Sequence, residues 1–115
     1  MKDYTKTLAI GYVAAEPEYK MVKNNQHLTT FPMICNLDYK DGNKMVPSKS
    51  HFKVVTWGPL AQLMKQICHK GNKVFVDGAI RVKNFQNKAT IELWCADIRI
   101  LTSDKALNKT DYESS

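Results

Sequence analysis

Apolar residues recur at every second position in several segments of this chain, and this period is typical of half-buried β-strands. Phe31, Met33 and Cys35, for example, share one parity. Because such strands bury one face against other strands, the pattern predicts an all-β fold. The five expected strands are Thr5–Val13, Leu28–Tyr39, His51–Trp57, Lys73–Lys83 and Ala89–Leu101.

One segment, between the third and fourth strands, has the period of a helix instead. Gly58-Pro59 ends the third strand, and Gly71 suits the left-handed position after a helix. The apolar residues between them lie at i, i+3, i+4 and i+7, namely Leu60, Leu63, Met64 and Ile67. The order β-β-β-α-β-β predicts a five-stranded antiparallel barrel with one short helix at its end. That is the layout of the OB-fold, which often binds oligonucleotides or oligosaccharides.

The segments between and after these elements are polar. Residues 40–50 predict a mobile hairpin loop with a turn at Asp41-Gly42. Residues 102–115 lose the apolar period and predict a short flexible tail. At 115 residues, the length is that of a single domain. We therefore expect one OB-fold domain over residues 1–101, followed by the tail.

Charge and cysteine content limit the partners and the compartment. The net charge of +6 favours a polyanionic partner, such as nucleic acid. No apolar run approaches the roughly 18 residues of a membrane span, so a soluble, cytoplasmic protein without a membrane partner is expected. Cys35, Cys68 and Cys95 form no CxxC pair. They predict free thiols rather than disulfides, and no metal or cofactor is expected.

Aromatic and basic residues fall together on the parity expected to face water. In the fourth strand and the turn after it, Arg81, Lys83 and Phe85 share one parity, and Val82 has the opposite, core-facing parity. Rings can stack on bases while cations contact phosphates, which suits single-stranded nucleic acid. The candidate DNA contacts are Tyr39, Lys40, His51, Lys53, Trp57, Arg81, Lys83 and Phe85.

These aromatic residues do not carry equal weight. Phe85 lies in a polar turn without apolar neighbours, so it is the strongest stacking candidate. Trp57 could stack on a base or pack under the helix, and Tyr39 could stack or simply close the second strand. Trp94 lies among Leu93, Cys95 and Ile98, which predicts a place in the core.

Catalytic motifs are missing from the sequence. It has no glycine-rich phosphate loop and no HExxH, and no Ser-His-Asp or Cys-His spacing is suggested. Its carboxylates, including Glu92, are scattered, whereas a metal nuclease needs clustered ones. The chain is therefore not expected to be an enzyme.

Several fragments, in order and at the right spacing, resemble the bacterial single-stranded DNA-binding proteins. The resemblance runs from about Lys6 to Leu101. It includes Leu8-Ala9-Ile10-Gly11 before Glu16-Pro17-Glu18, and Phe31-Pro32-Met33-Ile34-Cys35-Asn36 before Tyr39-Lys40-Asp41. Most specific are the segments FKVVTWGPLA at 52–61 and KGNKVFVDGAIR at 70–81.

The resemblance implies roles for individual residues. Tyr39, Trp57 and Phe85 match aromatic stacking positions of that family, and its basic positions are matched by Lys53, Arg81 and Lys83. His51 stands where the family commonly has Trp or Phe. The family also implies a homotetramer, less often a dimer. Its cellular members carry an acidic tail that recruits replication and repair enzymes, and the last residues here do not resemble that tail.

Three functions remain to be compared. The first is sequence-independent binding and protection of single-stranded DNA in replication, recombination, repair or uptake. The second is an accessory protein of the primosome type, whose OB-fold mainly binds replication or recombination proteins. A small nuclease on the same fold ranks last.

Overall fold

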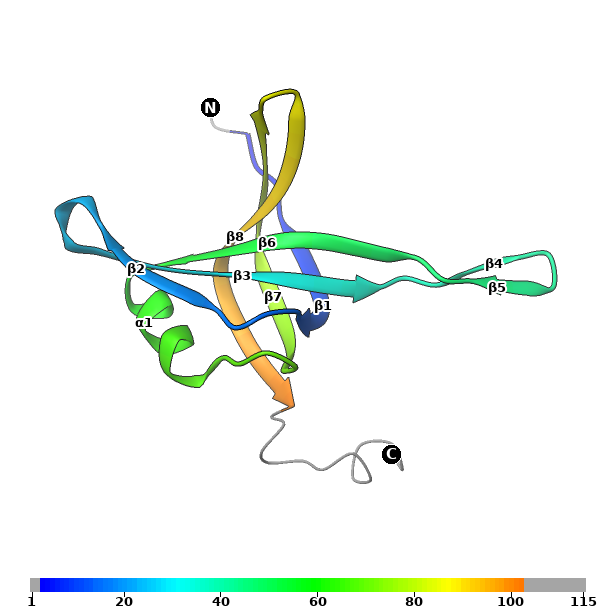
Figure 1. Cartoon of the computed structure of the whole chain (residues 1–115), viewed down its shortest axis with the longest axis horizontal. Helices are drawn as coiled ribbons and strands as arrows, with labels where there is room; N and C mark the ends of the chain where they lie inside the picture. Colours follow the sequence, from blue (N-terminus) through cyan, green and yellow to red (C-terminus); the bar gives the residue numbers. More distant parts are fainter. Residues whose placement is uncertain (1–2, 103–115) are drawn as a thin grey trace.

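The computed structural model describes residues 3–102. Within them the chain forms eight strands, one α-helix and one short 3-10 helix (Figure 1). In chain order they are β1 (Thr7–Val13), β2 (Glu18–Val22), η1 (Lys23–Asn25), β3 (Gln26–Asn36), β4 (Tyr39–Asp41), β5 (Lys44–Val46), β6 (Lys49–Trp57), α1 (Gly58–Ile67), β7 (Lys73–Phe85) and β8 (Lys88–Thr102). Residues 103–115 of the expected tail lie outside the described range.

Five of the strands pair in a ring. The main sheet has the order β1-β7-β8-β6-β3-β2, and β1 also pairs with β3 through Tyr12 and Val13. The ring of β1, β7, β8, β6 and β3 contains the five strands expected from the sequence, with α1 between the third and fourth of them. This confirms the predicted OB-fold. One pairing is not antiparallel, because β6 and β8 run parallel at Lys53–Val55.

Side chains from the inner faces of the ring form the core. Phe31, Met33, Val54, Val74 and Leu93 are all buried there. The helix lies against β3 and β6, with Ala61 and Met64 on its buried side. The hydroxyl of Thr29 donates to the carbonyl of Ala61 at 2.7 Å. The helix therefore covers one end of the ring.

Two parts of the chain differ from the prediction. The strand β2 was not expected, because its sequence EYKMV is mostly polar and follows Pro17. In the structure β2 pairs with one strand, β3. The segment expected to be a loop at 40–50 instead contributes the β4–β5 hairpin and the start of β6. Its turn lies at Gly42, where φ is +62°, next to the predicted Asp41-Gly42 signal.

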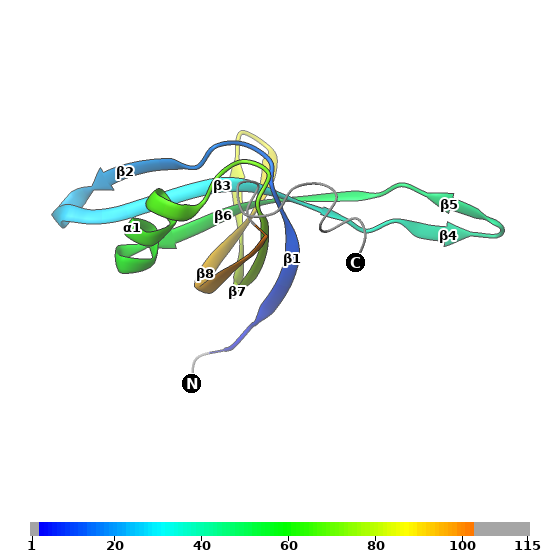
Figure 2. The same cartoon turned by 90° about the horizontal axis from the view of Figure 1, so that it is seen from below.

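Two hairpins extend beyond the ring, and we call them arms. The β4–β5 arm (residues 39–46) extends along the long axis on the side opposite α1 (Figures 1 and 2). The β7–β8 arm (residues 80–91) rises from the ring in a different direction. Val82 therefore remains 58% exposed although its parity pointed to the core. The parity was right only as far as the ring extends.

The three cysteines are free: Cys35 and Cys68 are buried, and Cys95 is half-buried. Desolvation raises the pKa of Cys68 and of Cys95 to about 12, so both thiols stay protonated near neutral pH. No cluster of three or more metal-binding side chains occurs among residues 3–102. None of the helices in that range is long and apolar enough to cross a bilayer.

Candidate nucleic-acid interface

The register of three strands brings distant residues together on the outside of the ring. Lys53 of β6 lies opposite Glu92 of β8, which in turn lies opposite Arg81 of β7. The next outward-facing residue of β8 is Trp94, whose neighbours on the adjacent strands are Val55 and Ala79. We call this surface of β6, β8 and β7 the three-strand face.

Trp94 is part of this face, and the expectation that it lies in the core was wrong. Its half-buried ring lies under the guanidinium of Arg81, whose central carbon is 4.1 Å from the ring centre. The ring of Trp57 is tilted by 48° to it, with the centres 5.8 Å apart. The apolar neighbours Leu93 and Cys95 have the opposite parity along β8, so they point inward.

The two indoles border a cavity of about 630 Å³. Trp57 ends β6 and directly precedes α1, and its indole Nε1 is buried without a hydrogen-bond partner among the described residues. Asn25 of η1 and Gln26 at the start of β3 also line the cavity. Its lining residues are Asn25, Gln26, His27, Trp57, Gly58 and Trp94. The cavity thus offers aromatic surface and polar groups at one end of the three-strand face.

Glu92 lies at the centre of the cations on this face. Its side chain is only 5% exposed. One carboxylate oxygen accepts a hydrogen bond from Nε1 of Trp94 at 2.9 Å and lies 3.7 Å from Nζ of Lys83. The other lies 3.9 Å from Nζ of Lys53. No local pattern in the sequence indicates this cluster, because its members meet only through the pairing of β6, β7 and β8.

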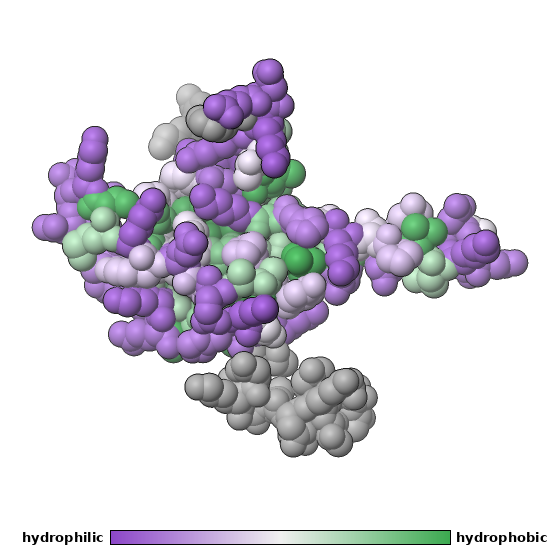
Figure 3. Space-filling model, in the orientation of Figure 1, coloured by the Kyte–Doolittle hydropathy of each residue, from purple (hydrophilic) through white to green (hydrophobic). Residues whose placement is uncertain are grey.

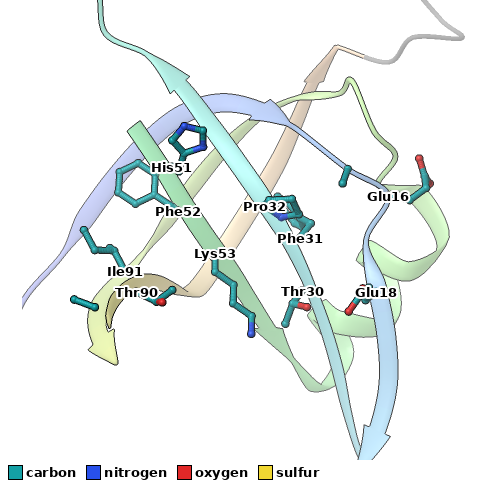
Figure 4. A pocket seen from close by; sticks show the side chains of 12 residues that line it. Glu16, Glu18, Thr30, Phe31, Pro32, His51, Phe52, Lys53, Thr90 and Ile91 are labelled. Carbon is teal, nitrogen blue, oxygen red and sulfur yellow. The ribbon is translucent and has the colours of Figure 1, made fainter. Parts of the chain in front are cut away.

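A second hollow, of about 600 Å³, lies beside β6 (Figure 4). His51 and Lys53 lie along it on β6, and residues 89–91 of the β7–β8 arm line another side. Glu16 and Glu18 lie on the far side of β3 (Figure 4). The backbone N–H of Lys70 and the ring of His69 lower the pKa of Glu16, so its carboxylate is charged near neutral pH. The hollow therefore has a basic and an acidic side.

The predicted DNA contacts are only partly brought together. Lys53, Trp57, Arg81 and Lys83 share the three-strand face, and His51 lies farther along β6. Tyr39 and Lys40 lie on the β4–β5 arm, where the Tyr39 side chain is 54% exposed. Phe85 pairs with Lys88 at the tip of the β7–β8 arm, but its side chain lies outside what the structure describes.

Comparison with known proteins gives consistent matches. The model of the single-strand binding protein family matches residues 4–100. Single-stranded DNA-binding protein 1 of Chlorobaculum tepidum is 23% identical over 103 residues, which are 84% of this chain and 64% of that protein. The chain thus spans less than two thirds of that relative. The protein of the same name from Xylella fastidiosa is 26% identical, with 95% of this chain and 85% of the relative covered.

Solved structures show the same fold. A Plasmodium falciparum SSB in complex with ssDNA superposes with a TM-score of 0.80 at 22% identity, and the match covers 89% of this chain and 98% of that one. A small single-stranded DNA-binding protein from Streptomyces coelicolor has a TM-score of 0.72 at 20% identity, with 87% and 95% covered. The fold of the ring is therefore shared with both.

Proposed function

Because this chain belongs to the single-strand binding protein family, we propose that it binds single-stranded DNA with little sequence preference. Proteins of this family are non-enzymatic DNA-binding proteins. In the proposed complex the strand crosses the three-strand face, with phosphates near Lys53, Arg81 and Lys83. Bases stack on the rings of Trp57 and Trp94.

The observation that carries this proposal is the environment of Trp94. A half-buried indole with an arginine 4.1 Å above it and a second indole beside it adds little to the core. Such a group suits a base, since every base has a π-face and stacking on one ring contributes about 1–3 kcal/mol. The cavity beside Trp57 and Trp94 leaves room for a base that has turned out of the strand.

Titration with oligo(dT) tests the proposal, followed by the tryptophan fluorescence of the protein. We expect quenching that saturates, weak competition by duplex DNA, and affinity that falls as salt rises. In a plot of the logarithm of the binding constant against the logarithm of the salt concentration, each neutralised phosphate should steepen the slope by about 0.7. Matched oligo(U) reports the preference for DNA over RNA. If oligo(dT) binds no better than duplex, the proposal fails, and a mainly protein-binding accessory role takes its place.

Protection of single strands in replication, recombination, repair or uptake is the cellular role we propose, and the cytoplasm is its location. The basic net charge of +6 supports a polyanionic partner, and a covered strand is shielded from nucleases and from reannealing. A nuclease-protection assay on a labelled oligonucleotide checks this role. We expect protection at protein concentrations that saturate the strand, and none at salt concentrations that abolish binding.

We further propose a homo-oligomer, with a tetramer favoured over a dimer as the family resemblance implies. Support comes from β1, where Leu8 and Ile10 are 58% and 53% exposed. Apolar surface is also visible beside the β7–β8 arm (Figure 3), which carries the exposed Ile80, Val82 and Ile91. Light scattering coupled to gel filtration measures the assembly, and Ile10→Glu is expected to reduce it. A monomer at high protein concentration would contradict the proposal.

A further inference from the structure

The carboxylate of Glu92 is buried at the centre of the three-strand face, where the proposed complex places phosphates, and this position requires a physical explanation. Removing a charge from water costs several kcal/mol unless partners compensate for it. Glu92 has these partners in the indole N–H of Trp94 and the ammonium groups of Lys53 and Lys83. The same two lysines are candidates for phosphate contacts, so the carboxylate and the DNA strand need the same cations.

From this competition we propose that Glu92 is a built-in anion of the DNA-binding face. In the free protein its carboxylate holds Lys53 and Lys83, and on binding these two lysines exchange the carboxylate for strand phosphates. The inference rests on the proposed function and extends it, because it names the residue that sets the strength and the salt dependence of binding. Its consequence is that the face binds DNA less tightly than its lysines alone would allow.

The distances fit an exchange of partners. The bond from Trp94 to Glu92 is 2.9 Å, a normal hydrogen bond, so the indole keeps the carboxylate in place. The two lysine nitrogens are 3.9 and 3.7 Å away, and their side chains are 50% and 63% exposed. These are loose ion pairs on flexible stems. The lysines can therefore swing to a phosphate while Glu92 stays beneath them.

Arg81 differs from the two lysines. It lies opposite Glu92 in the strand register, but its guanidinium lies over the ring of Trp94. The cluster therefore joins a stacking ring and a phosphate site through one carboxylate. A strand that takes the lysines from Glu92 also changes the electrostatic environment of the Trp94 indole.

The test is Glu92→Gln, in which an amide oxygen can still accept the bond from Trp94 while the charge is lost. Binding of a fluorescein-labelled oligo(dT) is measured by anisotropy over a series of salt concentrations. We expect several-fold tighter binding at low salt and a salt plot steeper by about 0.7, because in the unaltered protein the carboxylate that the lysines leave takes up a cation from solution and so offsets one of the counterions that the DNA releases. An unchanged or shallower slope, with equal or weaker binding at low salt, overturns the inference.

The matched control is Asp97→Asn on the same strand. Asp97 is exposed and pairs with Arg99 at 3.6 Å, so its loss also frees one cation. It lies roughly 16 Å along β8 from Glu92, beyond the screening length of about 10 Å at 0.1 M salt. We expect little change in slope. A control slope as steep as that of Glu92→Gln would show an effect of net charge alone and would also overturn the inference.

A measurement on the unaltered protein covers the case in which Glu92→Gln does not fold. The carboxyl carbon of Glu92 is followed by NMR while oligo(dT) is added. We expect its resonance to shift at saturation, together with the indole N–H of Trp94, while that of Asp97 stays in place. Binding without a shift at Glu92 overturns the inference alone, whereas failure of the unaltered protein to bind oligo(dT) rejects the proposed function itself.

Discussion

The guanidinium carbon of Arg81 lies 4.1 Å from the centre of the Trp94 ring. The two residues come from neighbouring strands, β7 and β8, and both have outward parity. A cation at this distance is attracted to the ring face. The contact therefore holds the indole on the outside of the ring, and a base that stacks on this face displaces the guanidinium toward a phosphate.

Replacing Trp94 tests the stacking role directly. We expect Trp94→Ala to weaken oligo(dT) binding by about 1–3 kcal/mol, because one stacking surface is lost. Trp94→Phe keeps a ring and should retain most of the affinity. Phe85→Ala gives the comparison with the residue that the sequence favoured. Anisotropy of a labelled oligonucleotide measures all three, and full affinity in Trp94→Ala would remove Trp94 from the interface.

The β4–β5 arm should matter only for long strands. Tyr39 lies on this arm, away from the three-strand face, so a short oligonucleotide can occupy the face without reaching it. We expect Tyr39→Ala to weaken binding of a strand longer than about 16 nucleotides and to leave one of about 4 nucleotides unaffected. The control is Met45→Ala, which trims the arm without removing a ring. Equal losses at both lengths would contradict the prediction.

Gly78 allows the close approach of β7 and β8 at a register shift next to Trp94. A Cβ there would lie 2.3 Å from the carbonyl oxygen of Trp94 and 2.9 Å from Cα of Cys95, so the backbone would have to move. We expect Gly78→Ala to lower the free energy of unfolding by about 1–3 kcal/mol.

Urea unfolding measures the effect of Gly78→Ala, and Gly42→Asn is its control. Gly42 has a φ of +62°, which asparagine tolerates, and no atom within 4 Å of the added Cβ. That change should stay within about 0.5 kcal/mol. Equal stability of Gly78→Ala and the unaltered protein would show that the two strands can separate at no cost.

Glu16 links the segment before β2 to the turn after α1. Its carboxylate accepts the backbone N–H of Lys70 at 2.8 Å and lies 3.1 Å from Nδ1 of His69. These contacts hold the pKa of Glu16 below its ordinary value of 4.5. A lowered pKa stabilises the fold at pH values above the ordinary one, and this contribution is lost as the pH falls through the folded value.

Thermal unfolding of Glu16→Gln over a pH series checks this link. We expect the unaltered protein to be more stable than the variant at pH 7, and the difference to shrink below pH 4.5, the ordinary pKa of this group. Because the carboxylate is exposed, the effect should be small. A difference that persists or grows on acidification would show that the charge of Glu16 contributes nothing to the turn.

Most strands and the helix could be predicted because their signals are local. Alternation in Phe31-Pro32-Met33-Ile34-Cys35 requires only the two faces of one strand, and Pro59 lies in the first turn of the helix as expected. The helix ends at Ile67, before Gly71, which takes its left-handed conformation in the turn that follows. Local signals failed where burial is absent. Val82 continues an alternating pattern but lies on the β7–β8 arm, where no second layer covers it.

The sequence by itself determined the five-stranded ring, the position of the helix and the basic, aromatic character of the outer strands, because periodicity and turn residues act within single segments. Only the tertiary structure decided which of these side chains meet. The pairing of β8 with both β6 and β7 places Trp94 under Arg81 and Glu92 between Lys53 and Lys83. Contacts between strands depend on register, and register arises from the closure of the whole ring rather than from any one strand.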